Sequence, residues 1–144
     1  MQQARGARPA LEDFEGQWRL EREIEDARAG QRVRFSGTAL FSPDTEGLLC
    51  EEAGDLILPG QPPMRASRRY LWRAQGEDIA VLFHDGRPFH LIGPGARPAA
   101  EHDCPPDFYR VRYDFRHWPD WEAEWRVSGP RKSYVMRSRY LRQA

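Results

Sequence analysis

The segment Glu101–Asp107 holds the densest group of reactive side chains in the chain, with an imidazole, a thiol and three carboxylates in seven residues. The thiol of Cys104 could act as a nucleophile if the imidazole of His102 lowers its pKa from the usual value of about 8.5. Side chains alternate along an extended strand, so His102 and Cys104 share one side and Asp103 takes the other. The prolines that follow Cys104 equally favour a stiffened structural turn. Catalysis is therefore kept as an alternative, carried by His102, Asp103, Cys104 and Tyr109.

Some arginines are expected on the same strand faces as aromatic residues and form a second group of interest. Arg22 and Arg68 are its clearest members. An unpaired buried charge costs several kcal/mol, so an arginine that points into a core needs a partner. That partner is either a carboxylate, such as Glu52 or Asp114, or an anionic ligand that the guanidinium fork binds with two hydrogen bonds. The sequence leaves both choices open.

Aromatic residues recur on the same faces as these arginines, and they are expected first of all to build a core. Aromatic walls with a few converging polar groups are also typical of small-molecule sites. A register error of one residue would exchange the two faces of any strand. The expected ligand-binding residues are Arg68, Tyr70, Trp72, Tyr109, Tyr113, Trp125, Arg137 and Tyr140.

The histidines and cysteines give no sign of a metal centre. His84, His90, His102 and His117 are scattered, without the spacing of a zinc-binding helix or ribbon. The two cysteines lie far apart and lack a CxxC spacing, so we expect reduced thiols and no disulfide framework. No metal and no cofactor is expected.

Alternation of apolar and polar residues between turn signals dominates the chain and predicts about nine strands. Gly54 is expected to mark a bulge or bend. Residues 93–106, rich in Gly, Pro and Ala, are expected to form a long connection, and residues 10–16 at most a short helix. Tight turns between sequential strands favour an antiparallel up-and-down meander, which closes to remove its edges. The expected strands cover residues 18–24, 33–41, 48–58, 64–72, 79–83, 89–92, 108–115, 121–127 and 133–141.

The charges cancel, with 22 basic and 22 acidic residues in 144, and Lys132 is the single lysine. A zero balance argues against a general nucleic-acid binder, which would need a broad cationic field. There is no apolar run long enough for a signal peptide or a membrane span. We therefore expect a soluble, cytoplasmic protein with a flexible leader over residues 1–13 and one domain over residues 14–144. The oligomeric state cannot be inferred.

Several strings carry a resemblance to known families. The GxW triplet Gly16-Gln17-Trp18 resembles the start of lipocalins and other calycins, in which the tryptophan closes one barrel end and packs on an arginine from a late strand. Here Arg137 or Arg139 would supply that arginine. The strings FEGQWRLER, RRYLW, DGRPFH, EHDCPPDFYRVRYDF and GPRKSYVMRSRY resemble a bacterial family of domains of unknown function. Calycin resemblance also implies two ligand modes: an arginine and tyrosines gripping a carboxylate at the cavity floor or, as an alternative, haem on a single histidine.

Together these observations predict an all-β protein, a single closed antiparallel barrel of about 8–10 strands with an interior cavity. Its expected function is to bind a small, largely apolar molecule that carries a polar or anionic head. An isomerase- or hydrolase-like enzyme that uses the same cavity and the His102-Asp103-Cys104 segment is the alternative, because fold alone does not choose between them.

Overall fold

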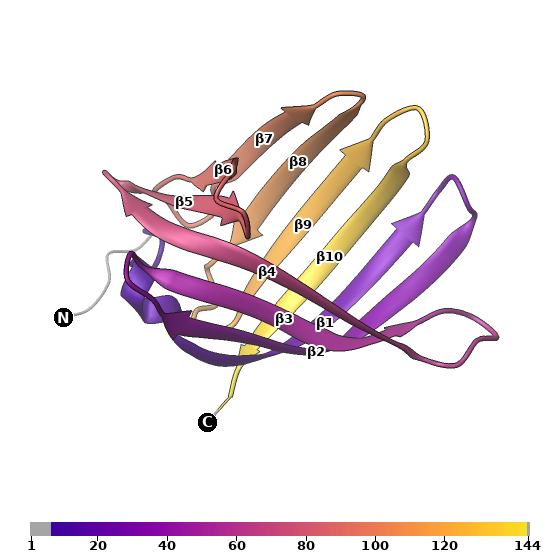
Figure 1. Ribbon diagram of the computed structural model, residues 1–144, viewed down its shortest axis with the longest axis horizontal. Helices are drawn as coiled ribbons and strands as arrows, with labels where there is room; N and C mark the ends of the chain where they lie inside the picture. Colours follow the sequence, from indigo (N-terminus) through magenta and orange to yellow (C-terminus); the bar gives the residue numbers. More distant parts are fainter. Residues whose placement is uncertain (1–6, 144) are drawn as a thin grey trace.

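The alternating runs form ten antiparallel strands in the computed structural model, which describes residues 7–143 (Figure 1). The expected all-β, calycin-like barrel is thereby confirmed. A short 3-10 helix, η1 (Leu11–Phe14), precedes the strands. The strands are β1 (Gly16–Asp26), β2 (Gln31–Pro43), β3 (Leu48–Ile57), β4 (Met64–Gln75), β5 (Asp78–Phe83), β6 (Pro88–Ile92), β7 (Ala99–Cys104), β8 (Asp107–Asp114), β9 (Trp121–Ser128) and β10 (Ser133–Arg142).

The strand order around the sheet is β6-β5-β4-β3-β2-β1-β10-β9-β8-β7. Pairing of β1 with β10 joins the first strand to the last and bends the meander into a nearly closed barrel. The two ends of this order, β6 and β7, approach each other at a seam but form no ladder. The barrel therefore has one open seam, and Figure 1 shows both strands at the same side of the molecule.

Strand β7 lies inside the segment that was expected to be a connection, so that expectation was wrong. Its single ladder partner is β8, with His102 opposite Tyr109 and Cys104 opposite Asp107. An edge strand buries little of either face, and none of the six residues of β7 is fully buried. Without a buried face the strand shows no apolar alternation, which is why its sequence resembles a loop.

Strands β2 and β3 come unusually close at Gly37 and Gly54, which lie opposite each other in the ladder. A Cβ atom on Gly37 would collide with the carbonyl oxygen of Ala53, and a Cβ atom on Gly54 with that of Ser36. Glycine is the residue that allows this close approach. The ladder passes through Gly54 without a shift in register, so the residue marks a close approach of the strands and not a bulge.

Helix η1 covers one end of the barrel (Figure 1). Phe14 is fully buried there, with its ring centroid 5.0 Å from that of Trp118. Part of the expected leader contacts the same end: Pro9 is buried, and Arg8 donates a hydrogen bond to the Ile92 carbonyl at 2.7 Å. The first six residues of the expected leader lie outside the described residues. In the described part of the chain, no helix has the length and apolarity needed to cross a membrane.

The arginine that packs on Trp18 is Arg142, whose guanidinium carbon lies 3.8 Å from the ring centroid. Its Nη atoms also donate to the backbone carbonyls of Asp13 and Glu15, at 2.6 and 2.7 Å, and so tie η1 to β10. The expectation that Arg137 or Arg139 would fill this place was wrong. Both side chains point to the outer face, whereas the closed end of the barrel lies near the end of β10.

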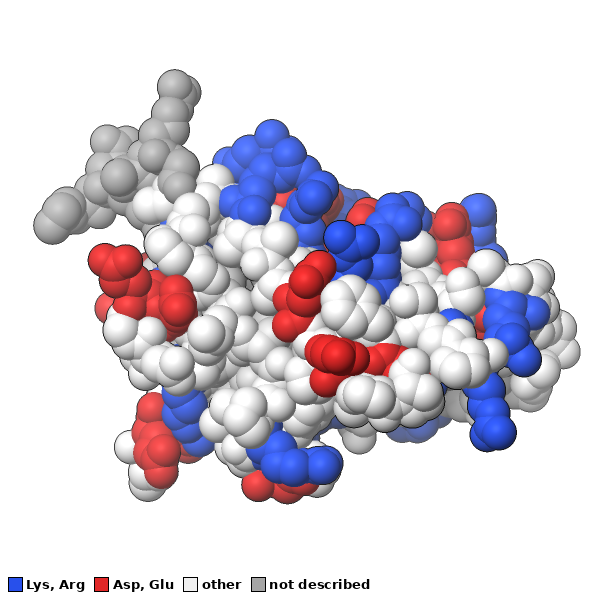
Figure 2. Space-filling model, turned by 90° about the horizontal axis from the view of Figure 1, so that it is seen from above, with Lys and Arg blue, Asp and Glu red and all other residues white. Residues whose placement is uncertain are grey.

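On the outer face, opposite charges alternate across neighbouring strands. One row runs through Arg34, Glu23, Arg137, Glu124 and Arg112, each facing the next in register. Such exposed pairs contribute about 0–1 kcal/mol each, but like charges in the same places would repel. Figure 2 shows basic and acidic side chains side by side over the visible face. The cancelled net charge thus corresponds to local pairing of charges.

Candidate functional site

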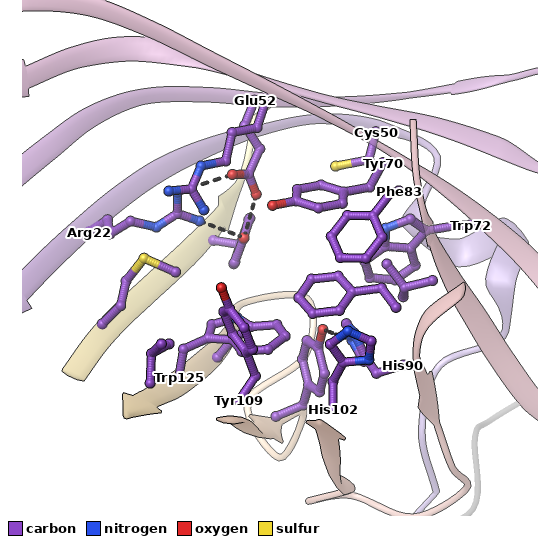
Figure 3. A pocket seen from close by; sticks show the side chains of 18 of the residues that line it. Arg22, Cys50, Glu52, Tyr70, Trp72, Phe83, His90, His102, Tyr109 and Trp125 are labelled. Atoms are coloured by element: carbon purple, nitrogen blue, oxygen red, sulfur yellow. Dashed lines mark hydrogen bonds and ion pairs between the residues drawn. The ribbon is translucent and has the colours of Figure 1, made fainter. Parts of the chain in front are cut away.

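The barrel encloses a cavity of about 330 Å³, lined mostly by aromatic rings that point inward from the strands (Figure 3). The cavity is closed at the end of the barrel that Phe14 of η1 plugs. Its mouth lies towards the β7–β8 and β9–β10 hairpins, where Cys104 and Lys132 belong to the lining. This volume falls in the range of small-molecule sites.

Most of the side chains expected to bind a ligand line this cavity. Strand alternation brings them to one interior, because inward residues recur at every second position. Lining shows that they are placed to touch a ligand; whether they bind one stays a prediction. The expected residues that line the cavity are Arg68, Tyr70, Trp72, Tyr109, Tyr113, Trp125 and Tyr140.

Arg137 was expected in this set, and its inward orientation was wrong. Its side chain is exposed on the outer face and pairs with Glu124 at 3.2 Å and with Glu25 at 3.7 Å. Tyr140 lies three residues along the same strand, so the two residues have opposite parity and cannot both face the interior. Tyr140 is the buried one.

The inner wall holds a buried ion pair between Arg22 and Glu52, with Nη1 3.0 Å from Oε1. Two neighbours complete the network: Arg22 Nε donates to Ser138 Oγ at 2.7 Å, and the Tyr140 hydroxyl donates to Glu52 Oε2 at 2.7 Å. Of the two partners that the sequence left open for Arg22, the structure shows a carboxylate, that of Glu52. Asp114, the other acid considered, pairs with Arg116 on the outer face.

Both members of this pair stay charged in spite of their burial. Burial opposes the charged form of Glu52, but the charge and hydrogen bonds of Arg22 outweigh it and lower the pKa of the carboxyl group. Burial likewise opposes the charge on Arg22, and Glu52 with Tyr140 raises the pKa of the guanidinium above its ordinary value. The inner wall is therefore polar but electrically neutral.

Arg68 lies across the β3–β4 ladder from Glu52, at the exposed part of the lining. Within residues 7–143 it forms no ion pair shorter than 4.0 Å, unlike its outward neighbours Arg65 and Arg69. Burial raises the pKa of the Tyr70 hydroxyl beside it, and the charge of Arg68 lowers that pKa in part. The remaining cations of the lining are both paired, Arg22 with Glu52 and Lys132 with Asp107 at 3.2 Å. Arg68 thus forms no close ion pair of its own, although its charge also helps to lower the pKa of the neighbouring Glu52 carboxyl group.

His90 is buried in the wall, where its Nε2 atom lies 2.8 Å from the Tyr113 hydroxyl. Burial lowers the pKa of His90 to about 3, with a smaller contribution from His102, so the ring is neutral near pH 7. The sequence drew attention to His90 only as a scattered histidine. Its role in the wall was missed, because a single histidine in an apolar strand carries no local signal.

A register shift between β5 and β6 brings an extra ring into the cavity. Val81 faces His90 and Leu82 faces Pro88, so Phe89 is the additional residue on β6. Bulges re-aim side chains, and Phe89 joins the lining next to His90, with its ring stacked on Phe83 at 4.4 Å between centroids. Phe83 and Phe89 were absent from the expected site, although the proline at the start of β6 is a signal for an edge or bulge.

The residues of the catalytic alternative lie close to the mouth. His102, Cys104 and Tyr109 line the cavity, while Asp103 is exposed on the opposite side of β7. The ring of His102 lies 5.3 Å from that of Phe89 between centroids, which places it at the seam. His84 and His117 are exposed and lie outside the lining. Among the described side chains, no three potential metal ligands gather at one place.

Two solved structures share this fold. The S-type phycobiliprotein lyase CPES from Guillardia theta superposes with a TM-score of 0.56 and 12% identity, over 93% of this chain and 90% of that chain. A protein of unknown function from the DUF3598 family of Nostoc punctiforme superposes with a TM-score of 0.60 and 10% identity, over 95% of this chain and 51% of that chain. At such identities the likeness shows the fold alone.

No curated protein matches the sequence. The model of a family of unknown function, DUF6314, matches residues 14–142, from the plug residue Phe14 to the arginine that packs on Trp18. The match covers the whole barrel, and the chain belongs to this family.

Proposed function

We propose that the protein binds a small, largely apolar molecule inside the barrel, with an anionic head held at the mouth by Arg68. One observation carries the proposal: an aromatic cavity of about 330 Å³ has in its lining the guanidinium of Arg68, which forms no ion pair within 4.0 Å to any carboxylate of residues 7–143. Aromatic walls supply the apolar burial, and a guanidinium supplies two parallel donors for a carboxylate or similar group.

The location of the head group follows from the charges. At the inner wall Glu52 already occupies the guanidinium of Arg22, and a second anion there would be repelled by the Glu52 carboxylate. The calycin resemblance implied an anion at the cavity floor. The charge distribution favours the mouth instead, with the apolar body of the ligand pointing inward.

The test uses two fluorescent probes that differ in one charged group: anilinonaphthalene sulfonate and its neutral counterpart, N-phenylnaphthylamine. The change is Arg68→Met, which keeps an unbranched apolar side chain and removes the charge. We expect the sulfonate probe to bind about tenfold more weakly, as expected for the loss of a charge-assisted hydrogen bond worth roughly 1.5 kcal/mol. Affinity for the neutral probe should stay within about twofold.

The matched control is Arg69→Met, on the same strand but on its outer face, where Arg69 pairs with Glu51 at 3.3 Å. It should leave both probes unaffected. Failure of both probes to bind the unmodified protein would overturn the proposal. Equal weakening of both probes by Arg68→Met would remove Arg68 as the anion contact. Native mass spectrometry of protein taken directly from cells would, in addition, show the mass of a retained ligand.

The enzyme alternative has its own geometric support, since His102 and Cys104 share the cavity side of β7. A thiolate at Cys104 would attack an ester carbonyl, expel the alcohol and form a thioester, which water would then hydrolyse with His102 as base. p-Nitrophenyl acetate tests this step. A hydrolysis rate above that of the Cys104→Ser and His102→Phe variants would support the alternative, and identical rates for all three proteins would exclude it.

A further inference from the structure

The hairpin between β3 and β4 ends in an apolar tip without charge. Residues 56–64 form this tip and hold three aliphatic residues, three prolines and Met64. Met64 is 48% exposed, and the three prolines are exposed as well. In Figure 1 the tip projects at the right of the view, on the side of the β1–β2 and β9–β10 hairpins. Those two hairpins carry charge instead, with Arg28 in the first and Arg131 and Lys132 in the second.

The tip has a defined local shape. The backbone amide of Gln61 donates to the Leu58 carbonyl at 3.3 Å and closes a turn that has Pro59 and Gly60 at its centre. Gly60 takes the positive φ of 70° that the third position of a type II turn requires. Residues 56–64 are not part of the cavity lining, so the tip does not serve as a wall of the binding site. An exposed apolar projection of this kind is typical of a surface that meets another molecule or a membrane.

Arginines without a carboxylate partner lie at the same end of the barrel. Arg34 is opposite Ile57 in the β2–β3 ladder, and Arg68 follows the hairpin on β4. Within residues 7–143, neither arginine has a carboxylate within 4.0 Å. The same holds for the exposed Arg28 and Arg131 of the neighbouring hairpins. The apolar tip is therefore accompanied by cations that are free to meet an external anion.

Unpaired carboxylates are concentrated at the opposite end. At the mouth, the described chain has two such acids, Asp26 and Asp103, against four unpaired arginines. At the closed end Arg97 lacks a carboxylate, but several exposed acids of that end lack a cation. These acids include Glu12, Glu15, Glu77 and Asp120. The zero net charge thus conceals an uneven distribution, with unpaired cations in excess at the mouth.

An apolar tip with unpaired arginines beside it matches the surface of a bilayer that contains anionic lipids. Apolar side chains are stabilised where headgroups meet acyl chains, and each arginine near an anionic surface adds electrostatic attraction. A groove on a partner protein would cover the tip alone. Arginines that are spread over β2, β4 and two further hairpins instead suit a broad anionic surface.

We propose that the mouth end of the barrel docks on an anionic lipid bilayer, with residues 56–64 among the headgroups and Arg28, Arg34 and Arg131 against the lipid phosphates. Only the tip enters the lipid, so no membrane-spanning segment is needed. Docking in this orientation turns the cavity mouth towards the bilayer, where apolar molecules accumulate. Transfer of a ligand between bilayer and cavity rests on the proposed function, whereas docking itself does not.

The test measures co-sedimentation of the full-length protein with sucrose-loaded vesicles. One set of vesicles is pure phosphatidylcholine, and the other contains equal parts of phosphatidylcholine and phosphatidylglycerol. We expect binding to the mixed vesicles at low salt and at least about tenfold weaker binding to pure phosphatidylcholine. Salt at about 1 M should release most of the bound protein, because it screens the attraction between arginines and phosphates.

A first pair of variants tests the tip. Met64→Asp places a charge in the tip, and we expect it to weaken binding to the mixed vesicles at least about tenfold. Leu91→Asp is the matched control, since Leu91 is 42% exposed on the outer face of β6 and the change in net charge is the same. This control should bind within about twofold of the unmodified protein.

A second pair tests the arginines. The double variant Arg28→Gln with Arg131→Gln removes two unpaired cations from the mouth end and should weaken binding about twentyfold. The control double variant, Arg97→Gln with Arg112→Gln, removes two cations that also lack an ion pair but line a groove on the outer face. It should bind within about threefold of the unmodified protein. Thermal melting of each variant verifies that it is folded.

The outcomes distinguish docking from other roles of the tip. No sedimentation of the unmodified protein with either set of vesicles would overturn the proposal. Equal losses in Met64→Asp and Leu91→Asp, or in the two double variants, would overturn the orientation. Self-association that Met64→Asp abolishes, without vesicle binding, would assign the tip to contact between copies. The naphthalene probes are measured without vesicles, so failure of docking leaves the proposed function standing, and the reverse also holds.

Discussion

At the scale of single residues, Glu52 has the most demanding environment in the described chain, since its carboxylate is charged and almost completely buried. Its charge is stabilised by two hydrogen-bond donors, Nη1 of Arg22 and the hydroxyl of Tyr140. Buried ion pairs contribute little net stability to the folded protein, because the cost of desolvating both charges offsets their attraction. Removing one partner is a different matter, because it leaves the other charge buried and alone.

Glu52→Gln is therefore expected to lower the free energy of unfolding by about 3 kcal/mol, because it strands the Arg22 guanidinium. The double variant Arg22→Met with Glu52→Leu removes both charges and should lose clearly less. Urea unfolding at pH 7 measures both values. A double variant that is less stable than Glu52→Gln would show that the pair itself is a large net source of stability, contrary to this reasoning.

At the scale of secondary-structure elements, the close approach of β2 and β3 depends on two glycines that face each other. Both backbone and side chain exclude a larger residue at Gly54. A Cβ atom there would collide with the partner backbone and would also come within 2.9 Å of the ring edge of Phe35. Backbone atoms cannot yield as a flexible side chain can. The close approach of these strands is therefore encoded by residues that have no side chain at all.

Gly54→Ala should lower the free energy of unfolding by about 2–3 kcal/mol, the usual effect of forcing extra volume into a packed region. Gly93→Ala is the matched control, because the nearest atom to its new Cβ would be Asp78 Oδ1 at an ordinary 3.8 Å. Circular dichroism melting curves compare the two. Equal melting temperatures would mean that β2 and β3 can separate without loss.

Some strands could be predicted from the sequence and others could not, depending on how much of each strand is buried. Strands with one buried face, such as β1 and β10, alternate clearly, and the sequence predicted them along with the inward position of Arg22. Strand β7 could not be predicted, because an edge strand with little buried surface has no pattern to read. The bulge that turns Phe89 inward depends on how β5 pairs with β6, and pairing is a tertiary property.

At the scale of the whole molecule, the barrel is held by ladders everywhere except between β6 and β7. Each of these two strands has a ladder on one side only, with β5 and with β8. Aromatic contacts cross the gap instead, including Phe89 of β6 against His102 of β7. Ring contacts protect side chains from water but do not protect backbone amides from exchange.

Hydrogen exchange should therefore be fastest, among the strands, in β6 and β7, and slowest in β1, β2 and β10, which have ladders on both sides. Exchange followed by mass spectrometry of peptic fragments measures this order. Amides of β6 and β7 that exchanged as slowly as those of β1 would indicate that the seam is closed in solution.

The assembly of the whole barrel also explains which parts of the site could not be predicted from the sequence. Parity along the strands brought seven expected side chains to the cavity, and parity also excludes Arg137, which shares its strand with Tyr140 at an odd separation. The partner of Arg22 remained a choice between a carboxylate of the chain and an anionic ligand, because distances across the barrel are set by its closure.

Because no ladder joins β6 to β7, the chain could connect the same strands in a different order. Gly16 at the start of β1 and Arg142 at the end of β10 lie at the same end of a shared ladder, where the Cβ of a residue at Gly16 would meet the Arg142 side chain. A circular permutant that joins these ends through a linker and begins in the turn at Gly95 would run from β7 to β10 and then from β1 to β6. Every ladder would be kept, and each pair would become neighbours in sequence. The β1–β10 pairing, now the longest loop that the folding chain must close, would become a local hairpin.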